Sequence, residues 1–208
     1  MQIVSIIPIT HGARTDTLTY YTSRLVGRGA LVTVPVRGKA TPGIVADVRD
    51  LSEEKATLKS QSYALQPISR VRHSAFLGEA HFGAIRTIAD YFAAPLGAVI
   101  ADLFPAAVLT DAAAIRTSPL PHAKERATVP TLIQAPFGER VQQYRAAIRS
   151  AFAAGTSVMV LLPSVYEIDL LAPELKKGIE QYTYLLHGEL SKSAQREGWC
   201  SALASEHP

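Results

Sequence analysis

Residues 135–141 form the segment whose residue types come closest to a phosphate-binding loop. They lie between an apolar segment and a helical pattern, which is where such a loop occurs. A working loop wraps phosphates with backbone N–H groups, uses a lysine to reach the outer oxygens, and holds magnesium through a hydroxyl. Here Pro136 has no N–H to donate, Glu139 adds negative charge, and neither a lysine nor a hydroxyl residue follows Arg140. We therefore interpret Gly138 and Arg140 as parts of a degenerate loop, and we expect no nucleotide cofactor and no ATP hydrolysis.

Other catalytic and metal-binding patterns are absent from the sequence. The six histidines have no metal-ligand spacing, no G-x-S-x-G motif occurs, and Cys200 is the single cysteine. A lone cysteine is typical of a reducing compartment. The sequence also has neither a signal-peptide pattern nor an apolar stretch long enough to cross a bilayer. We therefore expect a cytoplasmic protein with no metal site, no disulfide and no membrane insertion.

Basic residues are concentrated in the first half of the chain. The formal net charge is +3, and residues 1–105 hold 11 basic and 8 acidic residues, so the excess lies there. Within residues 14–39 the single acidic residue is Asp16, and the basic ones are Arg14, Arg24, Arg28, Arg37 and Lys39. This density suits a phosphate-binding surface, but a solvated basic face has the same composition. Both interpretations remain open on charge alone.

The elements that would carry these cations are short strands followed by helices. Period-two alternation and turn residues predict strands at 3–9, 17–21, 30–36 and 43–49, which we expect to curl into a small antiparallel barrel. Apolar residues at helical spacing predict a helix over 76–92 that ends before Pro95, and a second helix over 98–104. The first part is therefore predicted to be an α+β domain at residues 1–105.

The second half shows a different pattern. Residues 106–130 are alanine-rich and then proline-punctuated, which favours a linker. Beyond them, the sequence predicts strands near 131, at 158–162 and at 183–187, with helices around 141–152, at 168–181 and from about 191 to 199. Alternating strands and helices favour a parallel α/β class for residues 131–208.

Five segments together resemble the PriA family of primosomal replication restart helicases. IADYFAAPLGAVIADLFP (88–105) is similar to the helix that closes the family's N-terminal DNA-binding domain, and GALVTVPVRGKATPGIVADV (29–48) and LQPI (65–68) are similar to segments before it. SVMVLLPSVYEIDL (157–170) and LLHGELSKSAQREGW (185–199) resemble segments of the helicase lobe. The resemblance implies a 3′ DNA-binding domain at 1–105 and a partial, degenerate, RecA-like helicase lobe 1 at 131–208. The sequence stops before the Walker B acid, the zinc-binding cysteines and the second lobe of that family.

The resemblance also implies a function and a set of site residues. It implies binding of fork, 3′-end and single-stranded DNA during replication restart, with single-strand-binding protein and other primosome proteins as partners. The implied 3′-end pocket falls on Leu18, Thr19 and Tyr20, where the family has F-D-Y, on Gly38, and on Gln66, where the family has lysine. Tyr20 would stack on the terminal base, Gly38 would allow close approach, and Thr19 would accept a hydrogen bond without an aspartate's charge. Arg14, Arg37 and Lys39 would hold phosphates.

Three functional hypotheses follow from these observations. The first is a DNA-binding restart protein that does not hydrolyse ATP. The second is a protein interaction module, in which the sheet edges of residues 131–208 receive another primosome component. The third is a fragment of a larger active helicase. Binding to forked and tailed DNA, with and without ATP, separates the first hypothesis from the other two.

Overall fold

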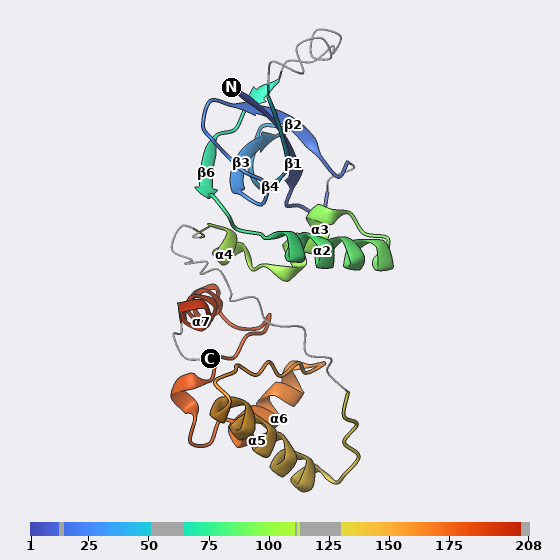
Figure 1. The fold of residues 1–208 in the computed structure, drawn as a ribbon, viewed down its shortest axis with the longest axis vertical. Helices are drawn as coiled ribbons and strands as arrows, with labels where there is room; N and C mark the ends of the chain where they lie inside the picture. The colour runs from blue at the N-terminus through green and yellow to red at the C-terminus, as the bar shows by residue number, and fades with distance from the viewer. Residues whose placement is uncertain (13–14, 51–64, 111, 113–129, 205–208) are drawn as a thin grey trace. The chain divides into compact units, whose positions relative to one another are not determined.

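The computed structural model describes residues 1–12, 15–50, 65–110, 112 and 130–204 of this chain (Figure 1). The chain divides into two compact units, Met1–Thr117 and Ser118–Pro208. Each unit is described by itself.

A six-stranded, strongly curled sheet forms the body of the first unit (Figure 1). Its strands are β1 (Gln2–Pro8), β2 (Leu18–Thr22), β3 (Leu31–Val36), β4 (Lys39–Asp50), β5 (Gln66–Pro67) and β6 (Arg70–His73), in the order β5-β2-β1-β4-β3-β6. All neighbours are antiparallel except β2 and β5, which are parallel. The four predicted strands are confirmed. The sheet is a half-barrel rather than the fully antiparallel barrel that we predicted, because β5 and β6 are separate edges and β5 runs parallel to its neighbour.

The apolar residues on the concave side of this sheet make its core. The largest fully buried side chains include Ile6, Val32, Val34 and Val45, and Val4, Tyr20, Val26 and Ala30 complete their cluster. Strand β1 bends at a register shift between Ser5 and Ile6. A bulge of this kind increases the local twist, which helps a short sheet to curl.

In the described part of this unit, three helices follow the sheet and pack close to one end of it (Figure 1). They are α2 (Glu79–Phe92), α3 (Leu96–Leu103) and α4 (Ala106–Thr110). Helix α2 ends at Phe92, with Ala93 as its C-cap, before Pro95 as predicted. It begins three residues later than predicted because the N–H groups of Phe76 and Leu77 donate to the Gly29 carbonyl instead of entering the helix.

Part of the predicted linker is helical and packed. Helix α4 occupies 106–110, with Val108 and Leu109 buried, and Arg72 donates from Nη1 to the Thr110 carbonyl at 2.7 Å. Residues 113–129 of the predicted linker lie outside the described residues.

The second unit is helical in its described part. It contains α5 (Phe137–Ala153), α6 (Val165–Leu175), a short 3₁₀ turn η2 (Glu180–Tyr182) and α7 (Lys192–Ala204). Its small core is formed by Val141, Ile148 and Leu175, with Tyr144, Phe152, Leu171 and Ile179 packed around them. These residues are the helical apolar stripe that the sequence predicted for α5, together with Leu171 and Leu175 of α6 and Ile179 after it.

The strands that we predicted for the second unit are not formed. Within residues 130–204 the structure assigns no β-strand, so the parallel α/β prediction for this part is not confirmed. Residues 158–162, predicted to be covered on both faces, leave Met159 82% and Leu161 83% exposed. An apolar run becomes a strand only when neighbouring strands satisfy its backbone groups, and none pairs with it here.

Within the described ranges, no single helix is long and apolar enough to cross a membrane. Helices α2 and α3 reach that length and composition together, but they are bent by 112° relative to each other.

Candidate nucleic-acid interface

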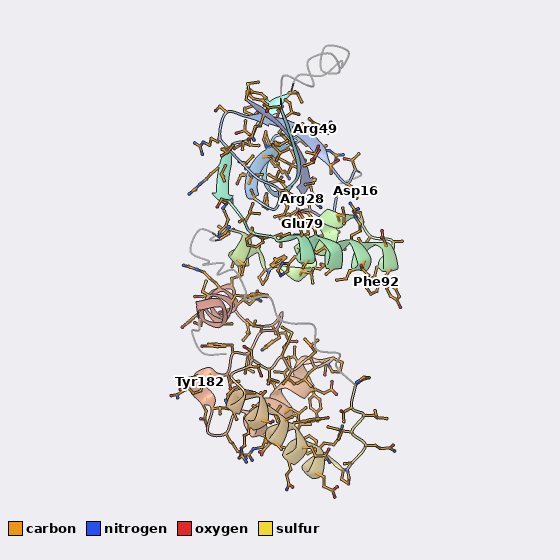
Figure 2. All side chains as sticks on the ribbon, viewed as in Figure 1. Asp16, Arg28, Arg49, Glu79, Phe92 and Tyr182 are labelled. Carbon is orange, nitrogen blue, oxygen red and sulfur yellow. The ribbon has the colours of Figure 1, made fainter. Side chains whose placement is uncertain are left out.

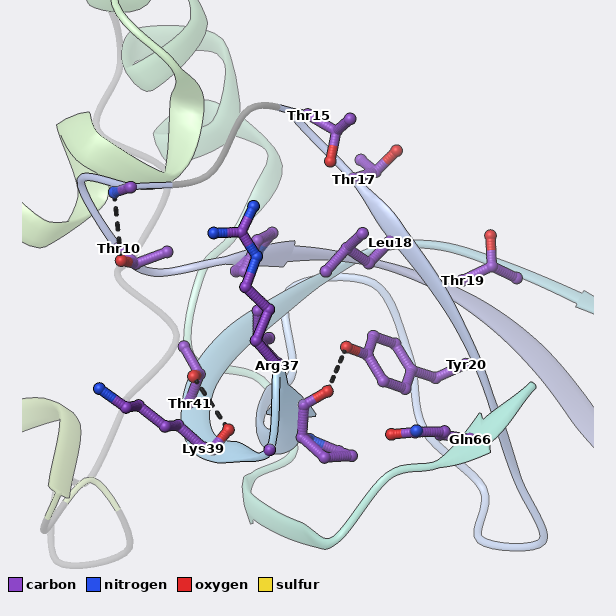
Figure 3. Close-up of a pocket in the computed structure, with 15 residues that line it drawn as sticks. Thr10, Thr15, Thr17, Leu18, Thr19, Tyr20, Arg37, Lys39, Thr41 and Gln66 are labelled. Carbon is purple, nitrogen blue, oxygen red and sulfur yellow. Dashed lines mark hydrogen bonds between the residues drawn. The ribbon is translucent and has the colours of Figure 1, made fainter. Parts of the chain in front are cut away.

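A pocket of about 720 Å³ opens on the curled sheet of the first unit (Figure 3). Its wall comes from four separate parts of the chain: the connection between β1 and β2, strand β2, the β3–β4 hairpin and strand β5. The lining residues are Pro8, Thr10, Gly12, Thr15, Thr17, Leu18, Thr19, Tyr20, Pro35, Val36, Arg37, Gly38, Lys39, Thr41 and Gln66. A volume of this size suits a small ligand or the end of a chain-like one.

The β3–β4 hairpin presents the two cations of the pocket. Val36 pairs with Lys39, so Arg37 and Gly38 are the two central residues of the turn, and both have positive φ, 49° and 77°. This is the type I′ geometry that matches the twist of a two-residue hairpin. Glycine adopts it readily, whereas a left-handed conformation costs an arginine roughly 1–2 kcal/mol. The turn therefore projects the exposed Arg37 side chain from a rigid and locally strained position.

Tyr20 anchors this hairpin to strand β2. Its side chain is 5% exposed, and its hydroxyl donates a 2.8 Å hydrogen bond to the Pro35 carbonyl, two residues before Arg37. Burial raises the pKa of the Tyr20 phenol above its ordinary value. The ring forms part of the floor of the pocket (Figure 3). With so little of it exposed, it leaves much less surface for stacking on a base than we expected from the sequence.

Leu18, Thr19 and Gln66 complete the side of the pocket opposite the hairpin. Leu18 packs partly against the core, and the next residue, Thr19, projects from the other face of the strand because side chains alternate. Figure 3 shows the Thr19 side chain directed away from Tyr20. Gln66 is aligned with Tyr20 in the parallel β2–β5 pair, and it is exposed at the rim of the pocket.

The charge of the pocket is entirely positive among its described lining residues. Arg37 and Lys39 are both exposed, and no aspartate or glutamate is among the residues that form the wall. Asp16 lies between Thr15 and Thr17 in the sequence, is exposed, and does not line the pocket. Such a wall attracts phosphate groups.

One basic residue of the 14–39 stretch, Arg28, makes contacts outside the pocket. Arg28 forms an ion pair with Glu79 at 3.2 Å, and its guanidinium lies 4.8 Å from the centre of the Phe82 ring. Arg28 and Glu79 lie close together in Figure 2. These contacts hold the β2–β3 connection against α2, so the charge of Arg28 supports the packing of the helix rather than the pocket.

The structure brings seven of the eight residues predicted to bind DNA around one pocket. They are Leu18, Thr19, Tyr20, Arg37, Gly38, Lys39 and Gln66, and Arg14 lies outside the described residues. The sequence reasoning missed the hydroxyl residues of the wall, Thr10, Thr15, Thr17 and Thr41. The threonines at 15, 17 and 19 share a period of two, which is a signal that could have placed them on one face of a strand.

The degenerate loop of the second unit is the start of a helix. Pro136 is the N-cap of α5, and the Arg140 N–H donates to the Pro136 carbonyl at 3.0 Å. Gly138 is therefore inside the first helical turn, where its N–H lies along the helix axis rather than in a loop that encircles a ligand. The Arg140 Nε is buried and has no hydrogen-bond partner among the described residues.

The curled sheet, the helices at its end and the cationic pocket define a small nucleic-acid-binding domain. Residues 6–105 match the family described as 3′DNA-binding domain (3′BD), and this part of the chain belongs to the N-terminal 3′ DNA-binding domains of the PriA family. DNA is therefore a partner of the first unit. A comparison of the chain with curated proteins found no match.

Proposed function

We propose that this chain is a replication restart protein that binds forked DNA and 3′ ends through the pocket of its first unit. The main support is that residues from three separate segments of the sequence line one cationic pocket. These are the residues that the family resemblance selected. A surface with only a general attraction for DNA would not require these residues to come together.

The pocket suits the end of a strand on physical grounds. Arg37 and Lys39, on one rigid hairpin, neutralise the last phosphates, while Leu18, Gln66 and the edge of Tyr20 contact the terminal sugar and base. Each phosphate contact of this kind releases a bound counterion, so binding weakens steeply as salt rises.

We also propose that the chain does not hydrolyse ATP. Support comes from the segment at 135–141, which combines a proline, a glutamate and an early helical turn where a phosphate loop needs free N–H groups, a lysine and a hydroxyl. In this proposal the second unit, which resembles part of a helicase lobe in sequence, contributes binding rather than a motor.

Fluorescence anisotropy of the full chain with four DNAs of equal length tests the proposal. Forked and 3′-tailed duplexes should bind more tightly than 5′-tailed and blunt ones, with the same ranking in the presence of ATP. The difference should shrink for Lys39→Gln and persist for Arg86→Gln, a matched change of an exposed charge on α2 outside the pocket. Equal binding of all four DNAs would exclude the proposal.

A second function, recognition of another restart protein by the second unit, is favoured by one observation. Residues 158–161 are an apolar run in which every side chain is exposed: Val158, Met159, Val160 and Leu161. Apolar surface of this continuity is unusual on a protein without a partner, and an extended segment with unpaired backbone can add to a partner's sheet.

Pull-down of single-strand-binding protein and primosome proteins by the full chain tests this second function. Met159→Ser with Leu161→Ser should abolish capture. Leu132→Ser is the matched control, because Leu132 is 91% exposed in the same unit but outside that run. Capture that survives the double change would remove residues 158–161 from the proposal.

A further inference from the structure

The pocket of the first unit has the composition of a site for a terminal phosphate. Its described wall combines two cations with the hydroxyls of Thr10, Thr15, Thr17 and Thr41, and holds no carboxylate. A hydroxyl can donate to a phosphate oxygen, and lysine and arginine bind phosphate through charge-assisted hydrogen bonds. A carboxylate in the same place would repel a terminal phosphate. The described wall, which has none, therefore admits a DNA end that carries a phosphate.

The hairpin that carries Arg37 and Lys39 forms the cationic side of the pocket. Figure 3 shows Arg37 extending from the turn across the pocket toward the side formed by Thr10 and Leu18. The turn is anchored below by the hydrogen bond from Tyr20 to Pro35, and its two residues hold left-handed backbone angles. An arginine in a conformation that asparagine or glycine adopts more readily is a strained feature of the kind that occurs at functional sites.

The hydroxyls of Thr10 and Thr41 form long hydrogen bonds within the protein. Thr10 Oγ1 accepts from the Gly12 N–H at 3.3 Å, and Thr41 Oγ1 donates to the Lys39 carbonyl at 3.3 Å. Both distances are at the long end for hydrogen bonds, so a phosphate oxygen can replace these contacts at small cost.

We infer that this pocket binds a DNA 3′ end that carries a terminal phosphate in preference to one that carries a hydroxyl. The inference rests on the proposed function, because it assumes that a 3′ end enters the pocket. A terminal phosphate brings between one and two additional negative charges near neutral pH, since its second pKa is close to 6. With Arg37 and Lys39 on one side and no facing acid in the described wall, this charge strengthens binding, by on the order of tenfold at low salt.

The test is a competition titration of the full chain with three single strands of one sequence: a 3′-hydroxyl strand, a 3′-phosphate strand and a circular strand without ends. The inference expects the 3′-phosphate strand to bind most tightly, then the 3′-hydroxyl strand, then the circle. A 5′-phosphate added to the 3′-hydroxyl strand should change its affinity little, because the 5′ end does not enter the pocket. A gain in affinity from the 5′-phosphate would be an effect of the added charge alone.

Two variants assign the preference to the pocket. Arg37→Gln should reduce the ratio of 3′-phosphate to 3′-hydroxyl affinity toward one, whereas Arg86→Gln should leave the ratio unchanged. Circular dichroism of both variants verifies that the sheet is folded.

The outcomes separate the inference from the proposed function. Equal or tighter binding of the 3′-hydroxyl strand, with both linear strands above the circle, overturns the inference and leaves end binding intact. A gain from 5′-phosphate equal to that from 3′-phosphate also overturns it. If all three strands bind equally, end binding itself fails and the inference fails with it.

Discussion

The Arg37 side chain suits phosphate binding, but its backbone conformation is one that asparagine or glycine adopts more readily. Its φ of 49° belongs to the left-handed region, and it occupies the first central position of a type I′ turn, where asparagine is favoured. Its exposed guanidinium lines the candidate DNA pocket. We therefore expect stability and binding to respond to substitution in opposite directions.

Arg37→Asn should raise the free energy of unfolding of the first unit by about 1 kcal/mol, because asparagine tolerates the turn conformation better. The same change should weaken DNA binding and reduce the salt dependence of the binding constant by about one phosphate contact. Urea unfolding followed by circular dichroism and salt-dependent anisotropy measure the two effects. Arg37→Lys is the control that keeps the charge. A variant that is less stable, or whose salt dependence is unchanged, would contradict this account of Arg37.

Tyr20 is a second residue whose role is structural first. Tyr20→Phe removes the donor to the Pro35 carbonyl and should cost about 1 kcal/mol of stability while changing the DNA affinity less than Arg37→Asn does.

Burial raises the pKa of Tyr20 above 10.0, so its stabilising effect is complete below pH 10.0 and is lost as the pH rises beyond that value. Unfolding measured from about pH 8 to about pH 11 should show a smaller alkaline loss in Tyr20→Phe than in the parent protein. Identical pH profiles would show that another group causes the loss.

At the scale of elements, close backbone approaches hold the helices on the sheet. A Cβ added to Gly97 of α3 would lie 2.0 Å from the Pro8 carbonyl at the end of β1, and one added to Gly29 would lie 1.9 Å from the Leu77 carbonyl before α2. These two glycines fix both helices at the end of the sheet that adjoins the pocket residue Pro8.

Gly97→Ala should destabilise the first unit by roughly 2–3 kcal/mol, because the added methyl forces α3 away from β1. Gly83→Ala is the matched control in α2, since nothing lies within 4 Å of its added Cβ, and it should stabilise the helix by up to about 1 kcal/mol. Thermal unfolding followed at a helix-sensitive wavelength compares the two. Equal stability of both variants would mean that α3 does not need the close approach.

The elements of the first unit were predictable because local patterns determine them. Alternation of Ile44, Val45 and their neighbours predicted β4, and Pro95 predicted the end of α2. The residues of the pocket came from family resemblance, since no local pattern reveals that residues 18–20, 37–39 and 66 meet. Alternation in Thr-Leu-Thr-Tyr-Tyr also does not tell which tyrosine faces inward, and the burial of Tyr20 was missed for that reason.

The strands predicted for the second unit do not form, and the reason is again that local patterns do not reveal contacts between distant segments. The apolar run at 158–162 has the composition of a buried strand, but pairing depends on partners distant in the sequence, which periodicity does not detect. The helical stripe of α5 was predictable, because its hydrogen bonds are all local.

At the scale of the whole molecule, the two units differ in net charge, and both expose apolar side chains, among them Tyr91 and Phe92 in the first unit and residues 158–161 in the second. The excess positive charge belongs to residues 1–105, where the pocket lies, and the exposed apolar run belongs to the second unit. The charge favours DNA binding by the first unit, and the continuous apolar run favours protein binding by the second.

One consequence of this division concerns ATP. Arg140→Ala should leave the DNA affinity unchanged, both with and without ATP, because Arg140 lies in the first turn of α5 rather than in a phosphate loop. A coupled assay for phosphate release with DNA present measures any hydrolysis. DNA-stimulated hydrolysis that disappears in Arg140→Ala would contradict the proposal that this chain has no motor activity.

We propose that the end of a DNA strand enters the pocket between β2 and the β3–β4 hairpin. Photo-crosslinking of a 3′-tailed duplex whose terminal base carries a photoreactive group, followed by mass spectrometry of the adducts, tests it most directly. We expect adducts at residues 15–20, 35–41 and 66, and we expect them to disappear when the group is moved to the 5′ end. Adducts concentrated in residues 130–204, or the same pattern from both ends, would contradict it.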